Sequence, residues 1–403
     1  MSGLSAAVEA AEVGFDVVIV ERNAYLGGRV SQLHHYFPKL CPPGCGLEIN
    51  FRRIRQNPRI RYLTMAEVEQ VTGKPGAYEV AVKVRPRFVT EKCTCCGKCA
   101  EAATQKVSDT FNLGMSQVKS AYLPFPAAFP QQFVIDPSVV GTQEGEALAK
   151  ACEYGAVDLT MTEKTVSLSV GAIVWATGWE PFDPSPIPYY HYGQHKDVIT
   201  NLMMERLAAL DGPTGGKIVR PSDGKAPEHV AFVQCAGSRD THYLPYCSGV
   251  CCLAALKQAT YVLEQYPQAT ATIFYIDIRA MDRLEEFYTK VAAHPRVKLV
   301  KSKVASITAD PQTGQLLLTG ENTEKAEPYR SAADLVVLSS GMVPNTATRK
   351  LPAEAQYDAY GFVAAAPAGA AIAGCVRRPM DVSMCVQDGT AAALRAIQTV
   401  SRR

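Results

Sequence analysis

The most constraining feature of the sequence is a helix that leads into a buried strand with an acidic residue at its end. Residues 2–14 are rich in alanine and other small residues and stop at Gly14, which is typical of a closely packed helix. The run 16–20 (DVVIV) predicts a buried strand that finishes at Glu21. This order is the second half of a dinucleotide-binding βαβ unit, in which the acid accepts hydrogen bonds from the adenosine ribose. An α/β fold is therefore expected, with Gly3 at the third glycine position of the unit.

The first half of this unit, a strand followed by two more glycines, is missing from the sequence before Gly3. In a complete unit the amides of that turn and the helix N-terminus receive the pyrophosphate. We therefore expect the natural polypeptide to begin upstream of Met1 and to be longer by roughly 10 residues, one strand and its turn.

Further glycine turns follow in the order found in flavoproteins with two dinucleotide domains. Gly27-Gly28-Arg29 would let the backbone approach FAD, and the segments 171–181 (GAIVWATGWEP) and 334–345 (DLVVLSSGMVPN) are strands that enter small-residue turns. Two such strands around a middle segment predict a glutathione- or thioredoxin-reductase-like plan, an FAD domain interrupted by a second dinucleotide-type domain. The alternative is an α/β protein whose glycines match by chance. The residues expected to bind FAD are Gly3, Glu21, Arg22, Gly27, Gly28, Arg29, Val68, Ala176, Thr177, Gly178, Gly374 and Cys375.

The middle segment opens with the buried strand HVAFVQ (229–234), but the turn after it reads CAGSRD and lacks the glycines that admit a pyrophosphate. The motif YCSGVCC and a helix over about 253–264 follow. Four thiols thus lie close together, and a [4Fe–4S] cluster takes thiolate ligands. The expected ligands are Cys235, Cys247, Cys251 and Cys252. A structural zinc site, or four unligated core cysteines, are the alternatives.

The segment 88–161 is expected to be an insertion that resembles a ferredoxin. CTCCGKC has the C-x₂-C-x₂-C spacing of an iron–sulfur run, although Ala103 replaces the next cysteine. In two-cluster ferredoxins the complementary ligand comes from a second run, of which Cys152 survives with Glu153 in place of proline. One [4Fe–4S] site is therefore expected in this module. Its ligands would be Cys93, Cys96, Cys99 and Cys152. The alternative is a relic that binds no metal.

Length and charge limit the other possibilities. A chain of 403 residues is too long for one ordinary domain, and its formal net charge of +2 gives no reason to expect nucleic acid as a partner. There is no apolar run long enough to span a bilayer and no signal-peptide pattern at the start, so a cytoplasmic protein is expected. In such a compartment the 13 cysteines favour metal or redox roles over disulfides. The expected segments are 1–87 (FAD domain, first part), 88–161 (ferredoxin-like insertion), 162–190 (return to the FAD domain), 191–333 (second dinucleotide-type domain with the iron–sulfur motif) and 334–403 (FAD domain, last part).

Several of these motifs together resemble the A subunit of heterodisulfide reductase, namely YLGGRVSQLHHYFPKLCPPGCGLEINFRR, the CAGSRD and YCSGVCC pair, and the ATG strand. The resemblance covers essentially the whole chain. It implies that FAD lies against the cluster held by the cysteines of the middle segment. It also implies that Gly374-Cys375 stands where related flavoproteins place Gly-Asp against the ribityl chain, so that Cys375 lines FAD without doing chemistry.

The half-lost inserted ferredoxin and the shorter length are more similar to the A subunit of the quinone-interacting membrane-bound oxidoreductase complex, which works with adenylylsulfate reductase in dissimilatory sulfur metabolism. The resemblance therefore implies a subunit that relays electrons through FAD and [4Fe–4S] clusters. Its partners would be iron–sulfur and quinone-reactive membrane subunits. The same resemblance implies adenylylsulfate reductase as a further partner. The protein would then lie at the cytoplasmic side of the inner membrane through these partners. Two other functions stay open, an NAD(P)H-dependent flavin oxidoreductase and a non-catalytic scaffold that binds zinc and flavin.

Two weaker expectations concern single elements. Cys41 and Cys45 flank a stiff Pro-Pro-Gly turn, and packing is favoured slightly over a redox role. The segment 384–393 is expected to be a helix whose positive N-terminal end faces the flavin.

Overall fold

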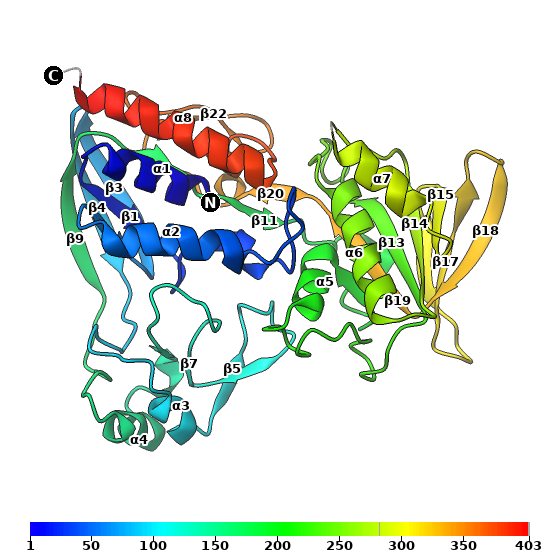
Figure 1. Cartoon of the computed structure of the whole chain (residues 1–403), viewed down its shortest axis with the longest axis horizontal. Coiled ribbons are helices and arrows are strands. Elements are labelled where there is room, and N and C mark those ends of the chain that lie inside the picture. The colour runs from blue at the N-terminus through cyan, green and yellow to red at the C-terminus, as the bar shows by residue number, and fades with distance from the viewer. Residues whose placement is uncertain (282, 402–403) are drawn as a thin grey trace.

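Small residues decide how the first and last helices of the chain meet. The computed structural model describes residues 1–281 and 283–401. The predicted N-terminal helix is confirmed as α1 (Ser2–Glu12), and Gly14 follows it with a φ of +101°. It lies beside α8 (Val382–Ser401), which contains the helix expected over 384–393 (Figure 1). A Cβ at Gly389 of α8 would stand 2.5 Å from the Ser2 carbonyl oxygen, so this close approach requires glycine.

The first lobe is built around this helix pair and several short sheets. Its strand β1 (Val17–Val20) is parallel to β2 (Ile60–Leu63), and β10 (Val174–Trp175) is parallel to β23 (Ala371–Ile372). A three-stranded antiparallel sheet has the order β3-β4-β9. The other elements of this lobe are η1 (Gly28–Gln32), α2 (Gly44–Gln56), β3 (Ala66–Lys74), β4 (Ala77–Val84), β9 (Lys164–Val170), β11 (Trp179–Pro181), β20 (Met342–Pro344), η4 (Asn345–Ala347), β21 (Gln356–Tyr357), β22 (Val363–Ala365) and η5 (Gly374–Val376).

A module of short elements is inserted between β4 and β9, and Figure 1 shows it below the first lobe. Two antiparallel strand pairs and two helices form it, around a small core that contains Phe88, Ile135 and Leu148. The elements are α3 (Lys98–Ala102), β5 (Lys106–Ser108), β6 (Gln117–Lys119), β7 (Ala121–Tyr122), β8 (Val134–Ile135), η2 (Pro137–Val139) and α4 (Gln143–Ala151).

The second lobe contains a five-stranded parallel sheet of order β12-β19-β13-β14-β15, followed by a three-stranded antiparallel sheet of order β16-β17-β18. Strands β13, β14 and β15 are joined by helices on one face, as expected for a dinucleotide-type domain. The elements are η3 (Pro188–Tyr190), β12 (Val198–Thr200), α5 (Asn201–Ala208), β13 (His229–Ala236), α6 (Cys251–Gln265), β14 (Thr270–Tyr275), α7 (Leu284–Ala292), β15 (Val297–Lys301), β16 (Ser306–Ala309), β17 (Leu316–Asn322), β18 (Glu327–Ala333) and β19 (Leu335–Ser340).

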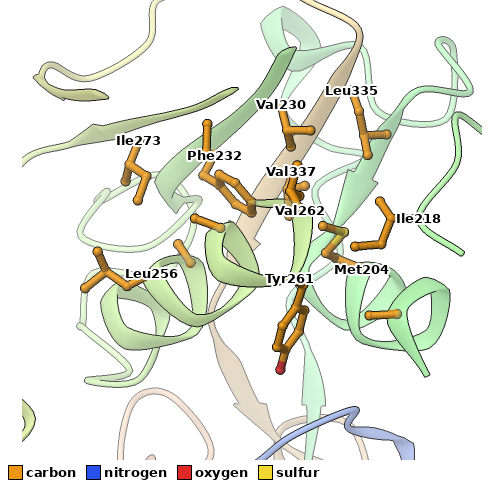
Figure 2. Packing of buried hydrophobic residues seen from close by; sticks show 14 of the residues in the cluster. Met204, Ile218, Val230, Phe232, Leu256, Tyr261, Val262, Ile273, Leu335 and Val337 are labelled. Carbon is orange, nitrogen blue, oxygen red and sulfur yellow. The ribbon is translucent and has the colours of Figure 1, made fainter. Parts of the chain in front are cut away.

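Helix α6 supplies much of the core of the second lobe. Figure 2 shows Leu256 and Val262 of this helix packed toward Phe232, Ile273 and Val337 on the strands, all of them buried. Each such side chain contributes about 1.5–3 kcal/mol through burial. The helix therefore holds its N-terminal end, and the cysteines there, in a fixed position against the sheet.

The structure differs from the sequence expectation at one segment boundary. Strand β19 falls in the segment 334–403 that was expected to belong to the FAD domain, but it pairs with β12 and β13 in the sheet of the second lobe. All residues of β19 are buried between the neighbouring strands. This position removes its apolar side chains from water and pairs its backbone hydrogen-bonding groups on both sides. The chain therefore returns to the first lobe only after Ser340. Within the described part of the chain, no helix has the length and apolar character needed to cross a membrane.

The fully buried guanidinium of Arg206 in α5 joins all three parts of the molecule. It donates to the carbonyl oxygen of Gln32 in the first lobe at 3.2 Å and to Oδ1 of Asn112 in the insertion at 2.8 Å. Its charge is balanced by Asp211, whose Oδ1 lies 2.8 Å from Nη2, and it also lies 4.6 Å from the ring centroid of Phe111. This arrangement fixes the insertion and the second lobe against the first lobe.

Replacing Arg206 by methionine should therefore destabilise the chain strongly, because it leaves buried polar partners without a donor. Breaking a buried charge pair costs about 3–5 kcal/mol, so the urea midpoint should fall clearly. Arg52→Met removes an exposed Arg52–Glu48 pair and should change the free energy of unfolding by less than about 1 kcal/mol. Equal midpoints for the two variants would contradict the role given to Arg206.

Candidate cofactor and iron–sulfur sites

Three of the turns expected to bind FAD meet where parallel strands end. Strands β10 and β23 run side by side, so the turn 176–178 and the turn 374–375 lie at the same edge. Gly3 in the first turn of α1 approaches them, because a Cβ there would lie 3.3 Å from the Cβ of Ala176. The crevice at the carboxyl ends of parallel strands is the usual place for a nucleotide ligand.

Two glycines of these turns adopt backbone conformations that other residues avoid. Gly178 and Gly374 both have a φ of +75°. A Cβ at Gly374 would also meet Ser2 Oγ at 2.2 Å. The Gly374 N–H donates to Asp388 Oδ2 at 2.7 Å. The turn at Gly374 is therefore held tightly between α1 and α8.

Glu21 lies directly after β1, as the dinucleotide pattern predicts. Its Oε1 accepts hydrogen bonds from the Asn23 N–H at 2.8 Å and from Asn23 Nδ2 at 3.0 Å. Burial raises the pKa of the Glu21 carboxyl, against the opposing effect of these hydrogen bonds. A partly buried acceptor at this point is suited to bind hydroxyl donors such as those of a ribose.

The Gly27-Gly28-Arg29 turn sits beside the same site. Gly27 and Gly28 have φ values of +113° and +58°, and the short helix η1 follows. Arg29 forms an ion pair with Glu180, which also lies 3.3 Å from Arg22. These two arginines thus share one carboxylate that comes from the strand after the turn 176–178.

Val68 has a different role from the turns. It lies in β3, paired with Val82, and packs in an apolar cluster that also contains Trp175 of β10. It therefore supports the strand that leads to Ala176 through packing.

The cysteines of the second lobe gather at the point where its strand order reverses. From β13 the chain proceeds to β14 and β15 on one side, whereas β19 and β12 lie on the other. Ligands of open α/β sheets bind where the strand order reverses in this way. Cys235, the last residue but one of β13, has a φ of +55°. The Cys251 thiol donates to the carbonyl oxygen of Ser340, the last residue of β19, at 3.5 Å.

The other two thiols complete this group. Helix α6 begins at Cys251, two residues earlier than the sequence suggests, so Cys251 and Cys252 both lie in its first turn. The Cys252 thiol donates to the Asp277 carbonyl oxygen at 3.6 Å, and the Gly249 N–H donates to Cys247 Sγ at 3.3 Å. Burial raises the pKa of the Cys235 thiol to about 11, and the neighbouring Cys252 and Cys247 thiols contribute to this rise.

The turn after β13 has little room for a pyrophosphate. A Cβ at Gly237 would lie 2.2 Å from the ring of Phe182, and the Phe182 N–H donates to the Gly341 carbonyl oxygen at 2.9 Å. The ring of Phe182 thus packs directly on the turn that receives a dinucleotide in nicotinamide-binding domains.

The four cysteines expected to form a site in the insertion line one pocket, together with Val89 and Phe133. They are Cys93, Cys96, Cys99 and Cys152. Gly97 and Cys95 have φ values of +84° and +57°, which turn the loop around this pocket. The Ala156 N–H donates to Cys152 Sγ at 3.2 Å. Burial raises the pKa of the Cys99 thiol to about 11.

Both cysteine groups fit a cluster in their chemistry: each has four thiols and a backbone N–H directed at a sulfur, a contact that tunes iron–sulfur clusters. Among residues 1–281 and 283–401, no three or more His, Cys, Asp or Glu side chains converge on a position for a single metal ion. A zinc site and a [4Fe–4S] site differ in geometry. A zinc ion binds its sulfurs at about 2.3 Å from one point, whereas each thiolate of a [4Fe–4S] cluster binds a different iron.

The sequence did not single out Cys385 as a site residue, although it lies in the first turns of α8 with its Sγ 3.7 Å from Cys375 Sγ. Their ten-residue separation matches no ligand motif, and only the packing of α8 on η5 brings them together. Cys41 and Cys45 lie beside Tyr36. Burial is the main cause that raises the pKa of the Tyr36 hydroxyl, and the Cys41 thiol is the second.

Glu21→Gln should weaken FAD binding by about 10-fold or more. Hydrogen bonds to a charged group are worth about 1.5–3 kcal/mol, and each 1.4 kcal/mol is tenfold in affinity. Calorimetric titration of FAD into flavin-depleted protein measures the change, and the affinity for FMN, which has no adenosine, should stay constant. Glu12→Gln, at the far end of α1 in a surface pair with Arg53, is the matched control. An unchanged FAD affinity in Glu21→Gln would contradict the assignment.

The fold matches solved flavoprotein structures. Thioredoxin reductase from T. acidophilum superposes with a TM-score of 0.53 at 13% identity, over 98% of this chain and 94% of that one. Thioredoxin reductase from Lactococcus lactis superposes with a TM-score of 0.51 at 12% identity, over 100% and 96% of the two chains. A family model described as an NAD(P)-binding Rossmann-like domain matches residues 1–63. The predicted α/β fold with two dinucleotide domains is therefore confirmed.

Curated relatives cover nearly the whole chain. The second of two iron–sulfur A subunits of CoB–CoM heterodisulfide reductase in Methanopyrus kandleri is 37% identical over 98% of this chain and 62% of its own length. The A subunit of the ferredoxin/F420H2-dependent CoB–CoM heterodisulfide reductase of Methanosarcina acetivorans is 35% identical over 99% of this chain and 52% of its own length. The chain thus spans between half and two thirds of these relatives. Over almost all of its length the chain is similar to the A subunits of CoB–CoM heterodisulfide reductases, and it has the fold of a thioredoxin-reductase-like flavoprotein.

Proposed function

We propose that this chain is an electron-transfer subunit that binds FAD in the first lobe and a [4Fe–4S] cluster through Cys235, Cys247, Cys251 and Cys252 in the second. The observation that carries this proposal is the strand β20, which links the two sites. On one side Met342 N–H donates to Ser248 Oγ at 2.8 Å, within the YCSGVCC motif. On the other side β20 pairs with β11, directly after the turn 176–178.

The segment from Ser340 to Asn345 thus touches both sites within six residues. Ser340 accepts from the Cys251 thiol, while Asn345 Nδ2 donates to the Thr177 carbonyl oxygen at 2.5 Å. A flavin exchanges two electrons and can pass them singly, whereas a cluster passes one at a time. The task of the residues here is to hold the two cofactors at a fixed short separation and to exclude water.

The surroundings of the second-lobe cysteines favour a cluster over a nicotinamide. Phe182 covers Gly237, and Gly341 approaches Ser238 and Ser248 so closely that a Cβ there would lie 2.5 and 2.8 Å from their Oγ atoms. The ends of β13 and β19 are thus filled by thiols and small side chains. We expect NAD(P)H alone to leave the flavin oxidised in the isolated protein.

The insertion supplies the proposed second cluster, through Cys93, Cys96, Cys99 and Cys152. Cys96 is exposed and the other members are partly or fully buried, so this site would stand near the surface of the molecule. An exposed edge is suited to exchange electrons with another protein of the complex, whereas the second-lobe site lies beside β20, which pairs with β11 of the first lobe.

The half-lost ferredoxin motif supports a narrower proposal about the complex. Ala103, buried at 2% exposure, occupies the position of a cysteine, and Glu153 pairs with Lys98 where a proline is expected. This pattern resembles the A subunit of quinone-interacting membrane-bound oxidoreductases. The proposed partners are therefore iron–sulfur and quinone-reactive membrane subunits that work in dissimilatory sulfur metabolism with adenylylsulfate reductase, and they would hold this chain at the inner membrane.

Anaerobic iron and sulfide analysis of cysteine variants tests the proposal. The purified protein should contain about 8 irons and one FAD, and Cys251→Ser and Cys99→Ser should each lose about 4 irons. Cys45→Ser, an exposed cysteine outside both groups, should lose none. The electron paramagnetic resonance spectrum after dithionite reduction should lose a different component in each of the two ligand variants.

The outcomes separate the alternatives. Iron near 4 that only Cys251→Ser removes would leave the insertion without a cluster. Zinc in place of iron would contradict electron relay and favour the scaffold. Rapid bleaching of the flavin by NAD(P)H would favour a self-sufficient flavin oxidoreductase.

A further inference from the structure

Two cysteines outside both proposed cluster sites face each other at the start of α8. Cys375 in η5 and Cys385 in α8 have their Sγ atoms 3.7 Å apart. Cys375 is 5% exposed and its thiol also lies 3.6 Å from the Met380 carbonyl oxygen, whereas Cys385 is only partly buried. The two sulfurs would need to approach by about 1.7 Å to reach disulfide bonding distance.

The surroundings of the pair differ on its two sides. Met342 and Met380 pack on Cys375, with Trp179 and Val250 at the edge of the same apolar cluster. This cluster therefore reaches from the turn expected to bind FAD to the residue that precedes Cys251. Cys385 lies between the exposed residues Met384 and Val386, which are 41% and 37% exposed.

The helix start favours a thiolate at Cys385. Asp381 closes the first turn of α8, where its Oδ1 accepts from the Met384 N–H at 2.7 Å, and Cys385 follows within the partial positive charge of the helix N-terminus. The neighbouring Cys375 sulfur lowers the pKa of the Cys385 thiol, against the effect of burial and with help from Ser2 and the Met1 amino group. Asp381 opposes this shift, and Asp388 is engaged by Gly374 N–H and Arg377.

We propose that Cys375 and Cys385 form a reversible two-electron dithiol/disulfide site, with Cys385 as the attacking sulfur and Cys375 as the resolving one. The site would exchange with small organic disulfides that reach the first turn of α8. It is independent of the proposed clusters and requires only the packing of η5 against α8.

The exchange uses two thiol–disulfide steps. The Cys385 thiolate attacks one sulfur of the external disulfide, which forms a mixed disulfide and expels one thiolate. The Cys375 thiol then loses its proton and attacks Cys385 Sγ, which expels the second thiolate and closes the internal disulfide. The Cys375 proton and the proton that Cys385 gave to solvent when it ionised end on the two released thiolates. The cysteine pair is oxidised by two electrons, and the external disulfide is reduced to two thiols.

Peptide mapping tests this directly, because trypsin separates the two residues. Cleavage after lysine and arginine places Cys375 in peptide 351–377 and Cys385 in peptide 378–395, with no other cysteine in either. The purified full-length chain, equilibrated anaerobically with oxidised dithiothreitol or glutathione disulfide and then alkylated, should give a cross-link between these peptides. Reduced dithiothreitol should restore two separately alkylated peptides. Separate alkylated peptides under oxidising conditions would overturn the proposal.

Single variants test the assigned roles by thiol mapping, without reliance on activity. In Cys375→Ser, glutathione disulfide should leave a stable mixed disulfide on Cys385, because the resolving thiol is gone. In Cys385→Ser, the buried Cys375 should stay unmodified while the chain remains folded by circular dichroism. Cys45→Ser, the matched control, should retain the 351–377 to 378–395 cross-link. Equal glutathione adducts in the two variants, or none in Cys375→Ser, would overturn the assignment.

Discussion

A pair of adjacent charged residues in α5, Glu205 and Arg206, holds the parts of this molecule together. Arg206 reaches the first lobe and the insertion, while Glu205 lies 3.0 Å from Lys257 Nζ and accepts from the His34 N–H at 2.9 Å. Although burial opposes ionisation, Lys257 holds the pKa of Glu205 below its usual value. Buried charges of this kind are tolerated only when every partner is in place, so they specify one arrangement of the lobes.

That single arrangement matters because the two proposed cofactor sites belong to different lobes. Each site stands at the carboxyl edge of parallel strands, one at β10 and β23 and the other at β13 and β19. The rule that ligands occupy such edges therefore applies twice in one chain. Strand β20 links the two parts, because Met342 contacts Ser248 of the second lobe and the strand pairs with β11 of the first. Electron transfer between two cofactors depends on their separation, so rigidity between the lobes has a functional consequence that packing within either lobe alone would not provide.

The sequence predicted the local elements better than the contacts between them. The helix at 2–14, the strand before Glu21 and the buried strand at 229–234 follow from periodicity and residue type, and each is present. The position of β19 in the second sheet was missed, because a buried parallel strand has the same apolar pattern in either lobe. The role of Arg206 was missed for a different reason: its partners Gln32, Asn112 and Asp211 are distant in sequence, and only the tertiary fold gathers them. Cys385 was missed because its partner lies ten positions away, in another element.

The cysteines show how the same side chain can be suited to two kinds of chemistry. At Cys235 and Cys99, burial raises the thiol pKa to about 11, and in each case neighbouring thiols add to the rise. Four such sulfurs can become thiolates together only if cationic iron offsets their charge, and metal binding does deprotonate its thiol ligands. At Cys385 the pKa shift has the opposite direction, since the neighbouring Cys375 sulfur lowers the pKa of its thiol. A single thiolate beside a neutral thiol is the starting state for disulfide exchange, whereas four neighbouring thiols are the starting state for a cluster. In the proposed assignment, the one-electron and two-electron sulfur sites therefore differ in the number of thiols that the fold gathers and in what stabilises their charge.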